Sequence, residues 1–483
     1  MDDSKIQKSS LKIVMCYVIR ELYDCEVYFY HSLDQGTFGR VITDKKLTNK
    51  DFDKITRRMN EIIEADYPIE RLGVNRDDAI KYYNEIGEYE KAKNVEFLPT
   101  RVLTFYKMLN EINYFYTDML EATGDILKFD IANLGHNEFV LTDSVDKKNY
   151  KEYTPRKNIY ESFNEYEEWC KALKINYLSD INSIVANRKI DDFIKQSDII
   201  HENKIYEIAY NIFNNQKRVV MLAGPSSSGK TTSARKLGIF LSTFGINPIK
   251  ISLDDYYKEY NELPVNEFGE KDIESPLSLD VKLFDKNIKD LLKGKEVVLP
   301  KYDFIKGKKN FEGSGIKLED NNVLIIEGLH SLNKIFTKNI DEKDIYKIYI
   351  SPLTPLNIDR HNYISTTDNR LLRRIVRDSR TRGKNASETI AQWAKVRENE
   401  DKYVFPYTND ADVVLNTAFI YEMGVLKVFA EPLLYTVKQD SVSYTEARRL
   451  IECLAPFFTI SSEHISNDNI LREFIGGSIF NEG

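Results

Sequence analysis

Eight consecutive residues near the middle of the chain have the types and the spacing of a phosphate-binding loop. They follow the pattern G-x-x-x-x-G-K-[ST] and read Gly224, Pro225, Ser226, Ser227, Ser228, Gly229, Lys230 and Thr231. The glycines let backbone N–H groups curl around phosphate oxygens, Lys230 can neutralise the β- and γ-phosphates, and Thr231 can bind Mg²⁺. An apolar run precedes the loop and a helix is predicted from Thr232 onward, which disfavours a chance glycine-serine turn. The pattern therefore predicts a nucleotide site.

Two further apolar runs in this part of the chain end in acidic residues. Residues 249–253 lead into Asp254 and Asp255, and residues 323–326 lead into Glu327. An aspartate within reach of an acceptor hydroxyl can take its proton as a phosphoryl group arrives, and a glutamate beside the loop can hold Mg²⁺ or its waters. The alternatives are that one of the aspartates caps the next helix and that Glu327 belongs to a turn.

A basic segment lies about 140 residues beyond the loop. Four of its arginines are spaced three or four residues apart and share one helix face, and a fifth precedes a glycine-containing loop. They are Arg370, Arg373, Arg374, Arg377 and Arg382. Guanidinium groups grip phosphate oxygens and spread transition-state charge, so phosphoryl-transfer enzymes close such arginines over the nucleotide as a lid. A solvated helix face and an RNA-binding patch are the alternatives, and the phosphate loop upstream weakens both.

The elements that must position these residues alternate in a regular way. Short runs of β-branched residues, apolar on both faces, are separated by helical segments and occupy residues 219–223, 249–253, 323–326, 345–350 and 413–415. Such runs predict an α/β fold in which helices cover both faces of a parallel sheet and ligands bind outside the carboxyl ends of its strands. We therefore expect the chemistry at that edge of the sheet.

The pattern of predicted strands and helices divides the chain into three parts. Residues 1–150 mix short strands with helices, as in an α+β domain, and residues 151–216 are predicted to form a helical connector. Residues 217–483 hold the phosphate-loop domain and a C-terminal extension.

Composition limits the environment and the partners. Sixty-eight Lys and Arg residues against 76 Asp and Glu residues give a net charge of −8 and a pI near 5.6, which disfavours nucleic acid as a partner. The four cysteines lack paired spacing, so neither a disulfide framework nor a zinc site is indicated. Neither a basic-then-apolar leader nor a run of the ~18 apolar residues needed to span a bilayer is found. We expect a cytoplasmic protein without a membrane partner.

The four motifs in this order resemble the uridine kinase family, which is related to phosphoribulokinase, over about residues 216–420. The resemblance implies a phosphate-loop kinase that uses ATP and Mg²⁺ to phosphorylate the 5′-hydroxyl of a small-molecule nucleoside. The catalytic residues that it implies are Asp254, Lys230, Arg373 and Arg377. ATP would be bound by the loop from Gly224 to Thr232 with Arg374 and Arg382, and the metal by Thr231 and Glu327. The implied substrate-binding residues are Asp254, Tyr256, Glu274, Tyr302, Phe304 and Arg370.

Two departures from the family pattern leave the acceptor open. Gly307 stands where pyrimidine-specific members carry a histidine, and Glu274 stands where the family has an aspartate that holds the ribose hydroxyls. A site without a buried polar partner loses discrimination between substrates. A sugar phosphate is an alternative acceptor, because Lys306, Lys308 and Lys309 could supply positive charge. A nucleotide-controlled tRNA-binding protein is the alternative from another class.

The front half is similar to the second N-terminal domain of threonyl-tRNA synthetases, as in Phe29-Tyr30-His31 and in residues 47–52 and 67–71. Its metal-binding positions fall near Lys8, Lys12, Phe115 and Met119, so no metal ligands are expected there. A dimerisation or substrate-covering role is the expectation for this half.

The two-part arrangement resembles bacterial uridine-kinase-like proteins, including a C-terminal extension at residues 430–434 and 471–477. In that extension Arg472 and Glu473 are expected either to pair at the surface or to reach a neighbouring subunit. Assembly as a homo-oligomer stays open.

Overall fold

A central sheet of five parallel strands organises the larger part of the molecule. The computed structural model describes residues 3–33, 36–143, 156–265, 269–304, 306–354 and 356–480. The strand order is β14–β13–β8–β12–β9, and every neighbouring pair is parallel. The strands are β8 (Val219–Ala223), β9 (Asn247–Ser252), β12 (Asn322–Glu327), β13 (Ile345–Ser351) and β14 (Val413–Asn416). The predicted parallel α/β sheet is confirmed.

Helices cover both faces of this sheet because successive side chains of each strand are apolar on opposite sides. On one face Val220, Leu222 and Ile325 pack against α7 (Ile190–Asn214) and α8 (Lys230–Thr243). On the other face Met221 and Ile326 pack against a second set of helices. These are α5 (Lys157–Ala172), α9 (Val281–Leu292) and α10 (Lys334–Thr337).

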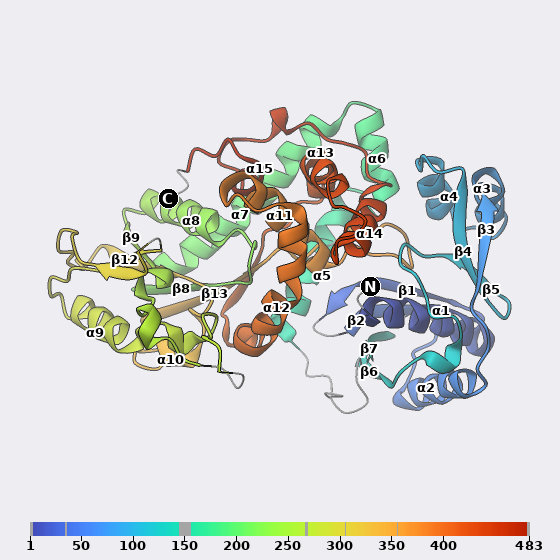
Figure 1. Ribbon diagram of the computed structural model, residues 1–483, viewed down its shortest axis with the longest axis horizontal. Coiled ribbons are helices and arrows are strands. Elements are labelled where there is room, and N and C mark those ends of the chain that lie inside the picture. Colours follow the sequence, from blue (N-terminus) through green and yellow to red (C-terminus); the bar gives the residue numbers. More distant parts are fainter. Residues whose placement is uncertain are drawn as a thin grey trace.

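A helical layer lies between the parallel sheet and the front half of the chain (Figure 1). It contains α6 (Leu178–Ala186), α11 (Thr366–Thr381), α12 (Ala386–Tyr403), α13 (Glu422–Tyr435), α14 (Tyr444–Leu454) and α15 (Arg472–Ile475). One apolar core joins α6 to the C-terminal helices, whereas α7 covers the parallel sheet. The helices predicted as a connector, α5, α6 and α7, are therefore shared among three cores. The predicted boundary at residues 150 and 151 lies outside the described residues.

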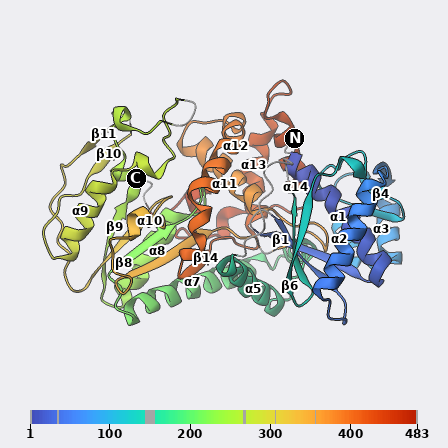
Figure 2. The ribbon, with the colours of Figure 1, turned by 90° about the horizontal axis from the view of Figure 1, so that it is seen from below.

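The front half is an α+β unit with two antiparallel sheets (Figure 2). The strands of the first sheet, in the order β1–β2–β7–β6, are β1 (Glu26–Leu33), β2 (Gly36–Ile42), β7 (Glu138–Asp143) and β6 (Phe129–Gly135). The second sheet contains β3 (Glu70–Asn75), β4 (Val102–Met108) and β5 (Glu111–Tyr114). The helices of this half are α1 (Asp3–Tyr23), α2 (Asn49–Glu64), α3 (Arg76–Glu85) and α4 (Tyr89–Glu96).

Shorter elements complete the described chain. A small antiparallel hairpin consists of β10 (Lys301–Asp303) and β11 (Lys308–Asn310). The 3₁₀ turns are η1 (Thr123–Asp125), η2 (Leu253–Tyr256), η3 (Tyr260–Glu262), η4 (Pro276–Ser278), η5 (Phe405–Asp410) and η6 (Ser462–His464). Within the described ranges, no helix has both the length and the apolar character needed to cross a membrane. All four cysteines are free thiols.

The loop that leads from β13 into α11 inserts between the two sheets of the front half. The amide nitrogen of Phe29 donates to the carbonyl oxygen of Arg360 at 2.9 Å, and Nζ of Lys91 lies 2.7 Å from Nδ1 of His361. The His361 ring stacks on Phe115, and Nζ of Lys12 lies 4.2 Å from the centre of the Tyr363 ring. Two of the positions expected to lack metal ligands, Lys12 and Phe115, thus contact the inserted loop.

Candidate active site

The phosphate loop forms directly after β8, where the sequence pattern places it. Gly229 has φ +84°, a left-handed conformation that favours glycine, and it precedes the first residue of α8. A Cβ on Gly224 would lie 2.3 Å from the carbonyl oxygen of Ile350, so only glycine allows this close approach. The N-terminus of α8 consequently points its backbone donors at the loop.

The Lys230 side chain folds back over the loop. Its Nζ donates to the carbonyl oxygens of Gly224 at 2.9 Å and Pro225 at 3.1 Å. Burial lowers the pKa of Lys230, and the nearby carboxylates of Glu327 and Asp254 oppose that effect. The ammonium group thus binds the loop and lies within electrostatic reach of the predicted base, Asp254, and of the predicted metal ligand, Glu327.

Glu327 and Asp254 come from neighbouring strands of the sheet. Glu327 lies opposite Ser252 in the β9–β12 register, and the Ser252 hydroxyl donates to its carboxylate at 3.3 Å. Burial raises the pKa of Glu327 to about 7, with Lys230 acting in the opposite direction. Surrounding protein also raises the pKa of Asp254, and Lys230 again opposes the change.

The structure gives Asp254 and Asp255 different surroundings, and neither of them caps the turn that follows β9. The side chain of Ser252 caps η2 by accepting the N–H of Asp254 at 3.4 Å, so neither aspartate is the cap. Asp255 instead accepts the backbone N–H of Tyr302 at 3.2 Å and holds the β10 strand. The Asp254 carboxylate is left at the carboxyl edge of the sheet, beside Lys230.

Two of the predicted arginines are buried beneath the loop. Arg370 pairs with Glu400 and is 1% exposed, and Arg373 pairs with Glu422 and is 0% exposed. Arg370 Nε donates to the Ser226 carbonyl oxygen at 2.9 Å. Both guanidinium groups bind protein carboxylates where α11 packs against the loop. The roles of Arg370 in acceptor binding and of Arg373 in catalysis stay predictions.

The other three arginines gather around one buried carboxylate, Asp378, and are more exposed than Arg370 and Arg373; we call these three arginines the open side of α11. Its oxygens lie 2.7 Å from Arg377 Nη2, 3.3 Å from Arg374 Nε and 3.6 Å from Arg382 Nε. Arg374 also donates to the Ser226 hydroxyl at 2.8 Å. Sequence reasoning missed Asp378, although its i+4 spacing from Arg374 and to Arg382 was a signal for such pairing. This arrangement groups three guanidinium groups around Asp378, and Arg374 among them contacts the phosphate loop.

The aromatic residues at the acceptor end differ from the prediction at one position. Tyr256 is fully buried, packs edge-on against Phe284 and accepts a hydrogen bond from Asn287, so it belongs to the core. The η2 turn directs the next side chain, Tyr257, toward Tyr302. Tyr257 was missed because two adjacent tyrosines give no signal of which one points inward.

Tyr257, Tyr302 and Phe304 form an aromatic cluster. Ring centres are 5.8 Å apart for Tyr257 and Tyr302, 6.0 Å for Tyr257 and Phe304, and 4.9 Å for Tyr302 and Phe304. Phe304 is 67% exposed, so the cluster offers ring surface to a ligand. Gly307 closes the hairpin with φ +65°, a conformation that a histidine at this position would adopt only with strain.

Glu274 lies within the electrostatic reach of the same site. Burial raises its pKa, Arg374 opposes that effect, and Asp254 adds to it. The structure thus brings Glu274 together with the predicted base and one of the arginines on the open side of α11.

The metal-binding prediction is consistent with the donors that are present. The Thr231 side chain is exposed at the start of α8, and Glu327 carries a carboxylate whose pKa is raised by burial. The described residues contain no group of three or more His, Cys, Asp or Glu side chains that could hold a metal ion. A Mg²⁺ ion beside a phosphate loop needs few protein ligands, because substrate phosphates and waters complete its coordination.

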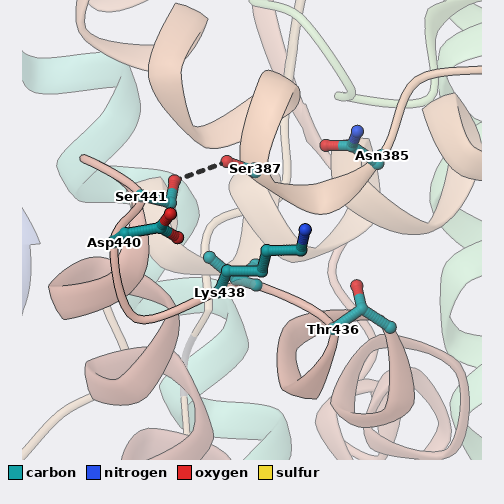
Figure 3. A pocket seen from close by; sticks show the side chains of 7 residues that line it. Asn385, Ser387, Thr436, Lys438, Asp440 and Ser441 are labelled. Atoms are coloured by element: carbon teal, nitrogen blue, oxygen red, sulfur yellow. Dashed lines mark hydrogen bonds between the residues drawn. The ribbon is translucent and has the colours of Figure 1, made fainter.

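A separate small pocket of about 230 Å³ lies where α12 begins, against the connection between α13 and α14. Figure 3 shows Lys438 and Asp440 beside it, with the Ser387 and Ser441 hydroxyls hydrogen-bonded at 2.7 Å. It contains none of the predicted site residues, so it is not part of the candidate active site.

Comparisons with known proteins match the region that carries this site. The model of the "Phosphoribulokinase / Uridine kinase family" matches residues 219–418. A uridine kinase from Staphylococcus epidermidis is 30% identical over 202 residues, which cover 42% of this chain and 88% of that protein. A uridine kinase from Staphylococcus aureus is 30% identical over 199 residues, covering 41% and 86%. A solved structure described as a possible uridine kinase from Bacillus stearothermophilus is 20% identical, with a TM-score of 0.28 and coverage of 41% of this chain and 89% of that chain.

Proposed function

Because the chain belongs to the phosphoribulokinase and uridine kinase family, we propose that this kinase of a small alcohol transfers the γ-phosphoryl group of ATP to the 5′-hydroxyl of a nucleoside. The observation that carries the proposal is that Asp254, which follows β9, and Lys230 of the loop lie within electrostatic reach of each other at the carboxyl edge of the sheet, where Tyr257 of the aromatic cluster follows Asp254 in the chain.

In the proposed mechanism the loop from Gly224 to Thr232 cradles the triphosphate and Lys230 leaves its loop carbonyls to contact the β- and γ-phosphates. Asp254 orients the acceptor hydroxyl and takes its proton as the γ-phosphoryl group arrives. Mg²⁺ bound by Thr231 and Glu327 would supply charge neutralisation at the phosphates.

The arginines divide into two groups in this proposal. Arg374, Arg377 and Arg382 approach the phosphates from the open side of α11 and stabilise developing negative charge. Arg370 and Arg373 act as positioning residues that hold the loop backbone. A loop held in advance costs little reorganisation when the reaction occurs.

The acceptor is assigned to the nucleoside class because the cluster of Tyr257, Tyr302 and Phe304 offers stacking surface for a base. We place the sugar near Glu274, and Gly307 leaves base selectivity broad. The sugar-phosphate alternative is weakened because Lys309 pairs with Asp280 at 2.8 Å and Lys306 lies 3.5 Å from Asp303.

For the front half we propose a synthetase-like domain that serves as a scaffold for the kinase. The proposal keeps the division of the chain into residues 1–150, 151–216 and 217–483. It also includes a cytoplasmic location and assembly as a homo-oligomer. It is supported by the insertion of His361 and Tyr363 between the front-half sheets, immediately before the arginine-bearing helix α11.

The test is phosphate transfer from ATP and Mg²⁺ across the common ribo- and deoxyribonucleosides and ribulose 5-phosphate. Lys230→Ala serves as the blank. Turnover of one or several nucleosides that disappears in the blank supports the proposal. Turnover of ribulose 5-phosphate alone, or of none of the panel while ATP still binds, contradicts the nucleoside assignment.

A further inference from the structure

A segment outside the family match supplies a side chain to the phosphate loop. Residues 468–477 lie beyond residues 219–418, and their short helix α15 packs beside α11 (Figure 1). One carboxylate oxygen of Glu473 accepts the Thr232 backbone N–H at 3.3 Å and the Thr232 hydroxyl at 2.7 Å. The expected surface pair of Arg472 and Glu473 is wrong, because Arg472 donates to carbonyl oxygens of its own segment, including Ile465.

The two donors of Thr232 belong to the phosphate-binding surface. Lys230 serves the β- and γ-phosphates, and Thr232 follows it in the first turn of α8, on the side of the α-phosphate. A backbone N–H and a hydroxyl each have one hydrogen to donate. Both hydrogens are directed to Glu473, so an α-phosphate oxygen cannot use them while the carboxylate stays in place.

We propose that Glu473 occupies the α-phosphate subsite of the nucleotide-free protein and must be displaced when a nucleoside di- or triphosphate binds. The proposal rests on the proposed function only in requiring that this loop binds a nucleotide. A carboxylate mimics a phosphate here because both present anionic oxygens to the positive end of a helix. Their like charges also prevent both from occupying the subsite together.

The segment that carries Glu473 is anchored by contacts that do not involve its carboxylate. Lys236 pairs with Asp468 at 2.8 Å, and Arg380 donates to the backbone carbonyl oxygen of Glu473 at 2.8 Å. A Cβ on Gly229 would lie 2.6 Å from a methyl group of Ile470, so this segment packs directly on the loop. These anchors keep the carboxylate close to Thr232 after displacement, which makes the exchange with nucleotide reversible and local.

The C-terminal extension therefore sets the affinity of the kinase for nucleotide. Each nucleotide that binds must first break the two hydrogen bonds between Glu473 and Thr232. Weakening these two hydrogen bonds therefore increases the affinity for nucleotide. Loss of a residue that supports nucleotide binding would instead lower that affinity.

The experiment measures binding of ADP with Mg²⁺ by calorimetry, in full-length protein and without an acceptor. Glu473→Gln keeps the shape and removes the charge, and Glu473→Asp keeps the charge but withdraws it by one methylene. Both variants are expected to bind ADP roughly 10-fold more tightly than the wild type. Glu463→Gln, an exposed position of the same extension, is the matched control and should leave the affinity unchanged.

The outcomes separate the two proposals. Unchanged or weaker ADP binding in both Glu473 variants overturns the inference, because Glu473 would then be neutral or supportive. Absence of ADP binding in the wild type overturns the nucleotide site itself, and with it the proposed function. Tighter binding in the Glu473 variants with unchanged binding in Glu463→Gln supports the inference, whichever acceptor the kinase uses.

Discussion

One face of α11 carries four arginines from one basic run, yet the structure uses them differently. Arg370 and Arg373 are enclosed beneath the phosphate loop and paired with Glu400 and Glu422. Arg374 and Arg377, one or a few positions away, lie on the open side and pair with Asp378. The comparison teaches that helical spacing predicts which arginines share a face, whereas the carboxylates contributed by other helices decide which of them remain available to a ligand.

The largest expected effect comes from removing Arg373, one of the two enclosed arginines. Arg373→Ala leaves the buried Glu422 carboxylate without its cationic partner, so the free energy of unfolding should fall by about 3–5 kcal/mol. Urea denaturation followed by circular dichroism measures it. The double variant Arg373→Met with Glu422→Leu should recover most of the loss, and Arg377→Ala should lose less than about 1 kcal/mol. Equal losses for Arg373→Ala and Arg377→Ala would erase the distinction between the two sides.

The second-largest expected effect tests the proposed catalytic base, Asp254. Asp254→Asn should lower turnover by at least ~10²-fold while ATP affinity and the unfolding midpoint stay nearly unchanged, because Asp254 makes its contribution only as the phosphoryl group is transferred. Steady-state kinetics measures turnover, titration calorimetry measures ATP affinity, and thermal denaturation measures the unfolding midpoint. Asp255→Asn is the matched control, since its amide oxygen can still accept the Tyr302 N–H. Unchanged turnover in Asp254→Asn would remove this residue from the mechanism.

The third effect is a pH dependence that arises from Glu327. Its pKa is raised from 4.5 to about 7 by burial, so the folded state favours the protonated form and loses this contribution as pH rises through that window. Without Mg²⁺ and nucleotide, Glu327→Gln should match the wild type in stability near pH 4.5 and become progressively more stable than it up to about pH 7. Urea unfolding at a series of pH values provides the measurement. Parallel curves for the two proteins would show that folding does not raise the pKa of Glu327.

The smallest expected effect concerns Arg374, one of the arginines of the open side. Arg374→Lys keeps the charge but loses the planar guanidinium that contacts both Ser226 and Asp378. We expect the KM for ATP to rise about 3- to 10-fold, with a stability change within ~0.5 kcal/mol. A larger loss of stability than of ATP affinity would place Arg374 with the enclosed arginines.

Much of the kinase half could be predicted from local patterns. The strands β8, β9, β12, β13 and β14 agree with the predicted runs to within a few residues, because a buried parallel strand requires a short apolar run of its own. The phosphate loop was predictable for a similar reason, since its glycines and Lys230 act through the backbone geometry of adjacent residues. The positions of Asp254 and Glu327 were predictable because both residues stand at the ends of predicted strands, and the carboxyl ends of parallel strands meet at one edge of the sheet.

The roles of several other side chains depended on segments far away in the chain. Burial of Arg373 required Glu422, and the choice between Tyr256 and Tyr257 required the core around Phe284. Contact between Glu473 and Thr232 joins residues 241 positions apart. Local spacing carries no information about such pairs, because the packing of separate helices creates them.

The sequence by itself therefore determined the α/β class, the phosphate loop and the acidic strand ends, all of which arise from short-range backbone geometry and the pattern of apolar residues. Only the tertiary structure decided which arginines are structural, which tyrosine faces the acceptor side and what lies against the first turn of α8. Those outcomes depend on burial and charge pairing between distant elements, and both are set when the chain packs.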